Sequence, residues 1–150
     1  MRVSDKHHEA LELLERWTTS LTVDHPVVTN VERDPDVDRW YVRARGEAKL
    51  VTTVWFTVRE RTLHFESYFL PSPEENTGEF YEYLLRTNAR LYGMRFSIGG
   101  EDATYLTGLV PLVGIVAGGE PELDRILGSV YAASEECFAT AGRIGFPRRF

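Results

Sequence analysis

Residues 39–70 have the sequence RWYVRARGEAKLVTTVWFTVRERTLHFESYFL, which is typical of three consecutive β-strands joined by tight turns. Aromatic and β-branched residues dominate the three segments, and apolar and polar side chains alternate along them. Turns are expected at Gly46 and Glu47 and again at Glu60 and Arg61. The pattern therefore predicts an antiparallel meander at the centre of the fold.

The two faces of this meander differ in character. If Glu60 and Arg61 form a two-residue turn, Val58 pairs with Leu63 and Phe56 with Phe65. The core face then carries large apolar side chains, namely Val54, Phe56, Val58, Leu63, Phe65 and Phe69. The second face is half apolar and half polar, with Val51, Thr53, Trp55, Thr57, His64, Glu66, Tyr68 and Leu70, to which we add Trp40. Because apolar side chains lie on both faces, we expect helices to cover one face and a partner to cover the other.

Helices are predicted before and after the meander. Apolar residues at three- and four-residue spacings between Ala10 and Leu21 predict an amphipathic first helix. A second helix is predicted to begin at Ser72, because a serine followed by proline and, three residues on, by Glu75 is typical of a capping box. Gly93 is expected to end this helix.

The C-terminal part predicts a second hairpin and a last helix. Residues 94–98 and 103–109 have strand character, and a glycine-rich loop over residues 111–120 precedes a helix over residues 121–141. We therefore expect a single α+β domain over residues 1–150, with an antiparallel sheet, helices packed on it and the element order α-β-β-β-α-β-β-α.

The composition narrows the classes of partner. The chain is 43% hydrophobic and 27% charged, as in globular proteins, and its net charge of −6 argues against nucleic-acid binding. Its single cysteine, Cys137, excludes an internal disulfide and fits a reducing cytoplasm. The longest apolar run, residues 109–117, is too short to span a membrane, and we find no export signal. We therefore expect a cytoplasmic protein that binds neither nucleic acid nor membrane.

Motifs for metal, phosphate and nucleophilic chemistry are incomplete. The segment from Asp34 begins like a calcium loop, but Arg45 occupies the position of its terminal glutamate. A helical zinc motif beginning at His8 lacks its second histidine. The glycines within residues 114–119 are not followed by the lysine of a phosphate-binding loop. The sequence therefore predicts no catalytic residue, no metal site and no cofactor.

One polar cluster on the second face remains a candidate ligand site. His64, Glu66 and Tyr68 project from the same face of one predicted strand. Histidine titrates near neutral pH, so this set has the chemistry for proton transfer. We favour the plainer interpretation, in which these side chains are the polar part of an interfacial strand.

Two arginines on the second predicted helix are another candidate. Arg86 and Arg90 lie one turn apart, so they have the spacing to bind an anion together or to pair with Glu82. Pairing with Glu82 is favoured. These residues and the His64 cluster support an alternative function, a small-molecule sensor or enzyme with a pocket between the helices and the sheet.

The chain resembles the YbjN-like family of small bacterial proteins. The resemblance spans residues 10–146 and is carried by RWYVR at residues 39–43, TTVWFT at 52–57, PSPEEN at 71–76 and YLLRTNARLYGM at 83–94. The family is labelled as sensory transduction regulators, and its fold is similar to that of type III secretion chaperones. The more apolar segment at residues 111–120 departs from the short polar connection expected for the family.

This resemblance implies a function in protein binding, because the secretion chaperones are small acidic homodimers that bind extended segments of client proteins. Combined with the partly apolar second face, it predicts a non-enzymatic protein-binding module, chaperone-like or regulatory, that acts as a homodimer. The expected protein-binding or dimer face comprises Trp40, Val51, Trp55, Tyr68 and Leu70. The sequence leaves open which sheet face forms the dimer.

Overall fold

The computed structural model describes residues 3–150, with side chains from residue 5 onward. Its elements are α1 (Val3–Val23), β1 (Val28–Arg33), β2 (Arg39–Arg45), β3 (Val51–Val58), β4 (Thr62–Leu70), α2 (Thr77–Asn88), β5 (Arg95–Ile98), the short 3₁₀ helix η1 (Gly100–Asp102), β6 (Thr104–Pro111) and α3 (Leu112–Gly145). The structure confirms the predicted α+β class with an antiparallel sheet and helices packed on it.

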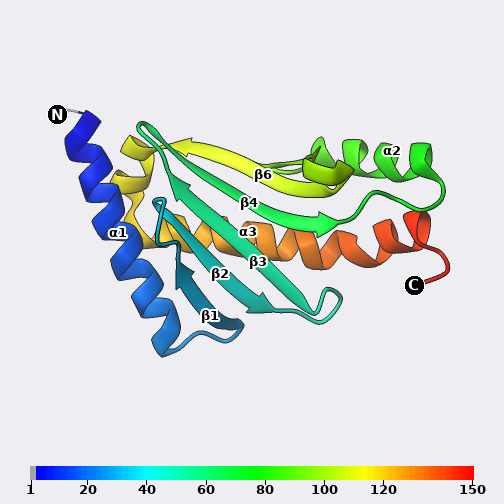
Figure 1. Ribbon diagram of the computed structural model, residues 1–150, viewed down its shortest axis with the longest axis horizontal. Coiled ribbons are helices and arrows are strands. Elements are labelled where there is room, and N and C mark those ends of the chain that lie inside the picture. Colours follow the sequence, from blue (N-terminus) through cyan, green and yellow to red (C-terminus); the bar gives the residue numbers. More distant parts are fainter. Residues whose placement is uncertain (1–2) are drawn as a thin grey trace.

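The six strands form one antiparallel sheet in the order β1-β2-β3-β4-β6-β5 (Figure 1). Strands β3 and β4 pair in the predicted register, with Phe56 opposite Phe65 and Val58 opposite Leu63. The register fixes which side chains share a face, because neighbouring residues of a strand point to opposite sides. The predicted core face is therefore confirmed.

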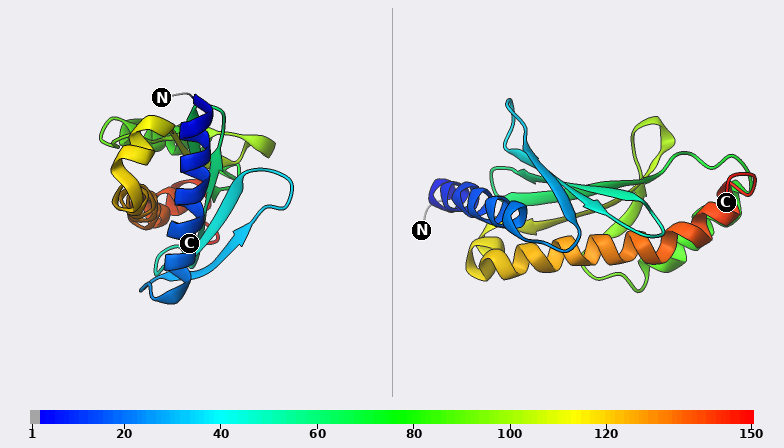
Figure 2. Two further views of the ribbon diagram at one scale, coloured as in Figure 1. Left: turned by 90° about the vertical axis from the view of Figure 1, so that its left-hand side faces the viewer. Right: turned by 90° about the horizontal axis from the view of Figure 1, so that it is seen from below.

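The three α-helices of the described residues lie on this core face. In Figure 2, α3 runs along the sheet and α1 crosses one end of it, while the other face of the sheet has none of these α-helices over it. The largest fully buried side chains include Trp17, Trp40, Phe56, Phe69 and Phe80. The rings of Trp17 on α1 and Phe56 on β3 meet edge to face with centroids 5.0 Å apart, so the first helix is anchored directly on the sheet.

Strand β1 was not predicted. It pairs with β2 and adds an edge strand between the first helix and the meander. Its sequence, VTNVER, carries only two apolar side chains and is mostly exposed. Such an edge strand is stabilised mainly by backbone hydrogen bonds to β2, and these leave little signal in the apolar pattern.

Helix α3 begins nine residues earlier than predicted, because the glycine-rich segment is helical rather than a loop. Leu112 and Ile115 are buried in the core. The backbone kinks at Gly119, with φ 68° and ψ −156°, and the helix then resumes. Pro121 lies two residues after Gly119, in the first turn of the resumed helix, where a residue needs no backbone donor.

Helix α2 begins at Thr77, so the predicted capping box at Ser72 is wrong. The residue before the helix, Asn76, has a left-handed backbone (φ 52°), and its side chain makes no capping hydrogen bond to α2. Residues 74–76 instead satisfy the end of α3, since the backbone N–H groups of Glu74 and Glu75 donate to the carbonyl of Gly145. Asn76 Nδ2 also donates to the carbonyl of Ile144 at 2.9 Å. Polar residues of this segment therefore cap another helix.

Trp40 and Leu70 were assigned to the wrong environment. Trp40 pairs with Phe56 and faces the helices, so it is only 1% exposed. Leu70 is 6% exposed, because an irregularity in the pairing between Tyr68 and Leu70 interrupts the strict alternation of β4. Neither side chain is available to a partner.

Candidate functional site

The sheet face opposite the helices is the main candidate, and we call it the open face. It carries alternate side chains of β2 to β6, including Arg39, Tyr41, Arg43, Val51, Thr53, Trp55, Thr57, His64, Glu66, Tyr68, Ser97, Tyr105, Thr107 and Leu109. Most of these side chains are half-buried by their neighbours in the sheet. Because the strands hold them in a fixed pleat, they form a rigid surface.

Four aromatic rings lie in pairs on the open face. Tyr41 and Trp55 contact each other edge to face with centroids 5.9 Å apart. Tyr68 and Tyr105 do the same at 5.7 Å, and Tyr68 is 41% exposed. Val51, at the start of β3, is 39% exposed. Of the predicted binding residues, Val51, Trp55 and Tyr68 therefore share one accessible face, while Tyr41 and Tyr105 were missed because the pairing partners of their strands were not predicted.

The polar part of the open face surrounds a hollow of about 300 Å³. Its polar lining combines cationic, hydroxyl and carboxylate side chains from five strands, β2 to β6, and the β3–β4 turn: Arg39, Thr57, Arg59, His64, Glu66, Arg95, Ser97 and Thr107. The predicted pair His64 and Glu66 is thus at a pocket, but the pocket lies on the open face and not between the helices and the sheet. Tyr68, the third member of that cluster, does not line it.

Electrostatics in the hollow favour neutral histidine. Partial burial lowers the pKa of His64, the positive charge of Arg59 lowers it further, and Glu66 opposes the shift. On the same face, partial burial raises the pKa of Tyr68, with smaller contributions from Tyr105 and Glu101. At neutral pH the positive charge of the hollow therefore comes from its arginines.

The predicted arginine pair on α2 is engaged elsewhere. Arg86 pairs with Glu82 at 3.3 Å, as the favoured interpretation expected. Arg90 lies just beyond the end of α2 and pairs with Glu136 on α3 at 2.9 Å. The structure therefore does not bring Arg86 and Arg90 together with His64 and Glu66.

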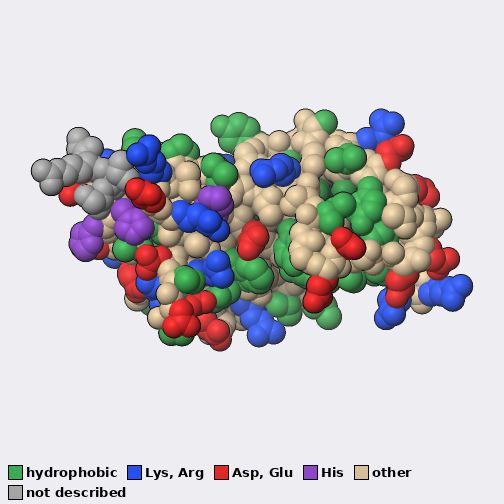
Figure 3. Space-filling model, turned by 45° about the horizontal axis from the view of Figure 1, so that its top comes forward, with side chains coloured by type: hydrophobic (Ala, Val, Ile, Leu, Met, Phe, Trp, Pro, Cys, Tyr) green, Lys and Arg blue, Asp and Glu red, His purple; other side chains and the backbone are tan. Residues whose placement is uncertain are grey.

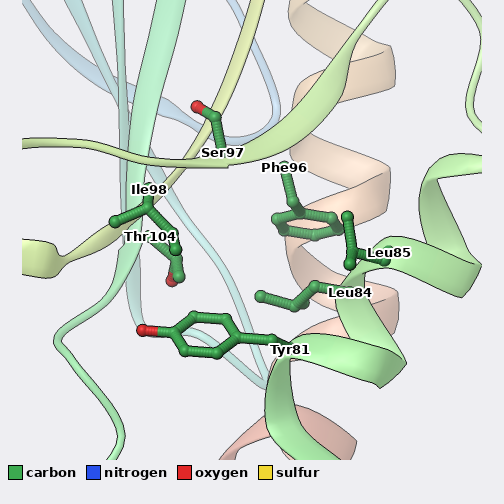
Figure 4. Close-up of a pocket in the computed structure, with 7 residues that line it drawn as sticks. All are labelled: Tyr81, Leu84, Leu85, Phe96, Ser97, Ile98 and Thr104. Carbon is green, nitrogen blue, oxygen red and sulfur yellow. The ribbon is translucent and has the colours of Figure 1, made fainter. Parts of the chain in front are cut away.

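A second surface feature is an apolar pocket of about 230 Å³ between α2 and the edge strand β5. Figure 4 shows its lining: Tyr81, Leu84 and Leu85 from α2, Phe96, Ser97 and Ile98 from β5, and Thr104 from β6. Leu85 is 68% exposed and Ile98 is 56% exposed. Apolar side chains also gather on this half of the molecule in Figure 3. This pocket could not be predicted from the sequence, because it forms only where α2 and β5 come together in the fold.

Three further features of residues 3–150 concern metal binding, the cysteine thiol and membrane spans. Within these residues, no group of three or more histidine, cysteine, aspartate or glutamate side chains is placed to hold a metal ion. Cys137 is buried, and burial is the main cause that raises the pKa of its thiol. None of the described helices combines the length and the apolar character needed to cross a bilayer.

Comparisons with known sequences find a family model and relatives that are similar to this chain. The YbjN family model, described as "Putative bacterial sensory transduction regulator", matches residues 4–143. An uncharacterized protein of Mycobacterium leprae is 30% identical over 128 residues, which cover 85% of this chain and 68% of that protein. An uncharacterized protein of Mycobacterium bovis is 32% identical over 105 residues, which cover 70% of this chain and 56% of that protein. The chain thus spans little more than half the length of the second relative.

Among solved structures, the chain is similar to SycH, a type III secretion chaperone of Yersinia pestis, whose crystal structure contains a stable fragment of YscM2. The TM-score is 0.54 at 16% sequence identity, and the alignment covers 83% of this chain and 96% of the chaperone. At this identity the similarity concerns the fold. It confirms the type III secretion chaperone-like fold that the resemblance implied.

Proposed function

Because this chain belongs to the YbjN family and has the fold of a type III secretion chaperone, we propose that it is a non-enzymatic module that binds an extended segment of another polypeptide. The observation that carries the proposal is the open face, where Tyr68 is exposed and Trp55 is half-buried on a sheet whose other face is covered by the chain's own helices. Aromatic side chains on an uncovered surface are typical of protein interfaces.

The geometry of the open face suits an extended segment. Val51, Trp55 and Tyr68 lie on adjacent strands, β3 and β4, and their side chains project from one side of the pleat. A bound polypeptide with apolar side chains at alternate positions would pack those side chains against the Tyr41–Trp55 and Tyr68–Tyr105 pairs. The polar side chains of the polypeptide would contact the hydroxyl and charged groups of the open face. The binding residues in this proposal are Val51, Trp55 and Tyr68, with Tyr41 and Tyr105 added.

The proposal includes a homodimer, which we assign to the apolar pocket between α2 and β5. Leu85 and Ile98 are largely exposed at this pocket, although both are apolar. The pocket lies on the helical side of the sheet, so a second copy bound there would leave the open face accessible. A cytoplasmic location is part of the same proposal, and a single buried thiol is consistent with it.

Protein capture from a lysate of the source organism, followed by mass spectrometry, tests the binding surface. Trp55→Asp places a charge among the aromatic rings of the open face. Tyr92→Asp makes a similar change at a side chain that is 81% exposed, in the loop that connects α2 to β5 and outside the lining of the apolar pocket. We expect Trp55→Asp to lose partners that the wild type and Tyr92→Asp retain. If both variants capture the same partners as the wild type, the open face is not the binding surface.

Light scattering over a dilution series tests the dimer. We expect a dimer mass for the wild type and a monomer mass for Leu85→Asp, which places a charge at the apolar pocket. Val113→Asp is the matched control, because Val113 is 61% exposed at the start of α3, outside the pocket lining. A monomer at all concentrations, or a dimer that Leu85→Asp does not disturb, contradicts the assignment.

A further inference from the structure

The hollow on the open face concentrates positive charge in an acidic protein. Three arginines line it, Arg39 at the start of β2, Arg59 in the β3–β4 turn and Arg95 at the start of β5. Within the described residues, none of the three has a carboxylate oxygen within 4.0 Å. Arginines elsewhere do, for example Arg149 with Glu74 at 2.8 Å. The guanidinium groups of the hollow therefore make no ion pair within salt-bridge distance among residues 5–150, although Arg39 donates to the Thr57 hydroxyl through its Nε.

Strand pairing brings these groups together from distant parts of the sequence. Arg39 lies opposite Thr57, and its Nε donates to the Thr57 hydroxyl at 2.8 Å. Arg95 lies opposite Thr107, which in turn lies opposite Glu66 on β4. The hollow thus has a floor formed by the strands, and its arginines come from β2, from β5 and from the β3–β4 turn. Figure 3 shows positively charged and histidine side chains side by side on this part of the surface.

We infer that this hollow is a binding site for a phosphate group. Three guanidinium groups against the single carboxylate of Glu66 leave two positive charges in excess, which matches a phosphate dianion. The hydroxyls of Thr57, Ser97 and Thr107 supply neutral donors. Since the net charge of the chain is −6, the protein as a whole repels anions. A phosphate in the hollow is therefore attracted by the local positive charge of its arginines.

The hollow is open to solvent, so a substituent on the phosphate can extend outward along the open face. The phosphate group is the recognised chemistry, whether it is carried by the free ion or by a phosphorylated side chain. The inference goes beyond the proposed protein-binding function, because it concerns recognition of a phosphate group and not of apolar side chains of a polypeptide.

Isothermal titration with sodium phosphate, at an ionic strength held constant with sodium chloride, tests this inference on the full chain. We expect saturable binding by the wild type. Arg59→Gln and Arg95→Gln should each weaken it about tenfold or more, the typical loss of a charged hydrogen-bonding partner. Glu66→Gln should strengthen binding, because it removes the one negative charge of the hollow. Both arginines are exposed, so these variants are expected to fold.

Arg61→Gln is the matched control, because it changes the net charge in the same way, two residues away and outside the hollow. It should bind phosphate like the wild type. No saturable binding by the wild type, or equal losses for Arg61→Gln and Arg59→Gln, overturns the inference.

A phosphoserine peptide and its unphosphorylated twin identify the source of the phosphate. Tighter binding of the phosphoserine peptide than of inorganic phosphate indicates a phosphorylated polypeptide. Binding of inorganic phosphate alone indicates a free ion or a small ligand. Both results support the site, and neither depends on the outcome of the capture experiment.

Discussion

Trp40 on β2 and Trp55 on β3 lie on opposite faces of the same sheet, because Trp40 pairs with Phe56 and Trp55 pairs with Tyr41. The offset of one residue sends one indole into the core and leaves the other on the open face. Trp40 Nε1 donates to Glu15 Oε1 at 3.2 Å, and the guanidinium of Arg33 lies 4.2 Å from its ring centroid. Trp40 is therefore a structural residue, whereas Trp55 lies half-buried on the open face.

Alanine substitution at these two positions should separate stability from binding. Trp40→Ala removes a fully buried indole and should lower the free energy of unfolding by about 3–5 kcal/mol. Trp55→Ala loses mainly its contact with Tyr41 and should lower it by about 1 kcal/mol. Urea denaturation followed by circular dichroism measures both values. Equal losses would mean that Trp55 also belongs to the core.

The parts of the fold that could be predicted are those with a strong apolar period. The β3–β4 register followed from alternation around a two-residue turn, and it correctly placed Trp55 and Tyr68 on the second face. Trp40 was predicted on the second face, but its pairing with Phe56 places it on the core face, and the apolar pattern alone does not give the register of β2 against β3. Leu70 was misplaced because alternation cannot reveal an irregularity in strand pairing.

The hollow could not be predicted for a different reason. Arg39, Arg59 and Arg95 lie in three separate segments, and only the strand order β2-β3-β4-β6-β5 brings them to one place. No local motif records such an arrangement. Arg86 and Arg90 have a helical spacing that is visible in the sequence, but the structure pairs their charges with Glu82 and Glu136.

Glu135 on α3 should stabilise the β2–β3 turn in a pH-dependent way. Its carboxylate accepts hydrogen bonds from the backbone N–H groups of Glu47, Ala48 and Lys49 at 2.9–3.1 Å. Desolvation alone would raise the pKa of Glu135, but these bonds and the charge of Lys49 outweigh it and hold the pKa below its usual value. Glu135→Gln should lower the free energy of unfolding by about 1–2 kcal/mol at neutral pH.

The sign of the pH effect follows from the lowered pKa. The folded state binds the proton less readily than the unfolded state, so the contribution of Glu135 is complete above the pKa of the unfolded chain. It is lost as the pH falls through the lower pKa of the folded state. The difference between wild type and Glu135→Gln in urea denaturation should therefore shrink on acidification. A difference that stays constant with pH would show that the carboxylate charge is not involved.

Gly119 should be intolerant of a side chain because of its backbone. Its φ of 68° and ψ of −156° fall in a region that is essentially restricted to glycine. Gly119→Ala should lower the free energy of unfolding by about 1–3 kcal/mol. Gly114 is the matched control, because it lies in the helical segment before the kink and a Cβ there meets no atom within 4 Å. Gly114→Ala should be neutral or stabilising, by up to about 1 kcal/mol.

The nearest atom to a Cβ at Gly119 is Pro121 Cδ at 3.7 Å, an ordinary contact. The expected loss is therefore backbone strain and not a clash. Thermal unfolding of both variants measures the difference. Equal stability of Gly119→Ala and wild type would indicate that the two parts of α3 can join without this kink.

Acrylamide quenching of tryptophan fluorescence should report on the open face in the isolated protein. Of the three tryptophans, Trp17 and Trp40 are each 1% exposed, while Trp55 is only half-buried. The quenchable emission should therefore come from Trp55, and Trp55→Phe should abolish it. If a second copy binds at the α2–β5 pocket, the quenching should not change as the protein concentration rises and the dimer forms. Quenching that declines in step with dimer formation would place the dimer contact on the open face, and the polypeptide segment would then need another surface.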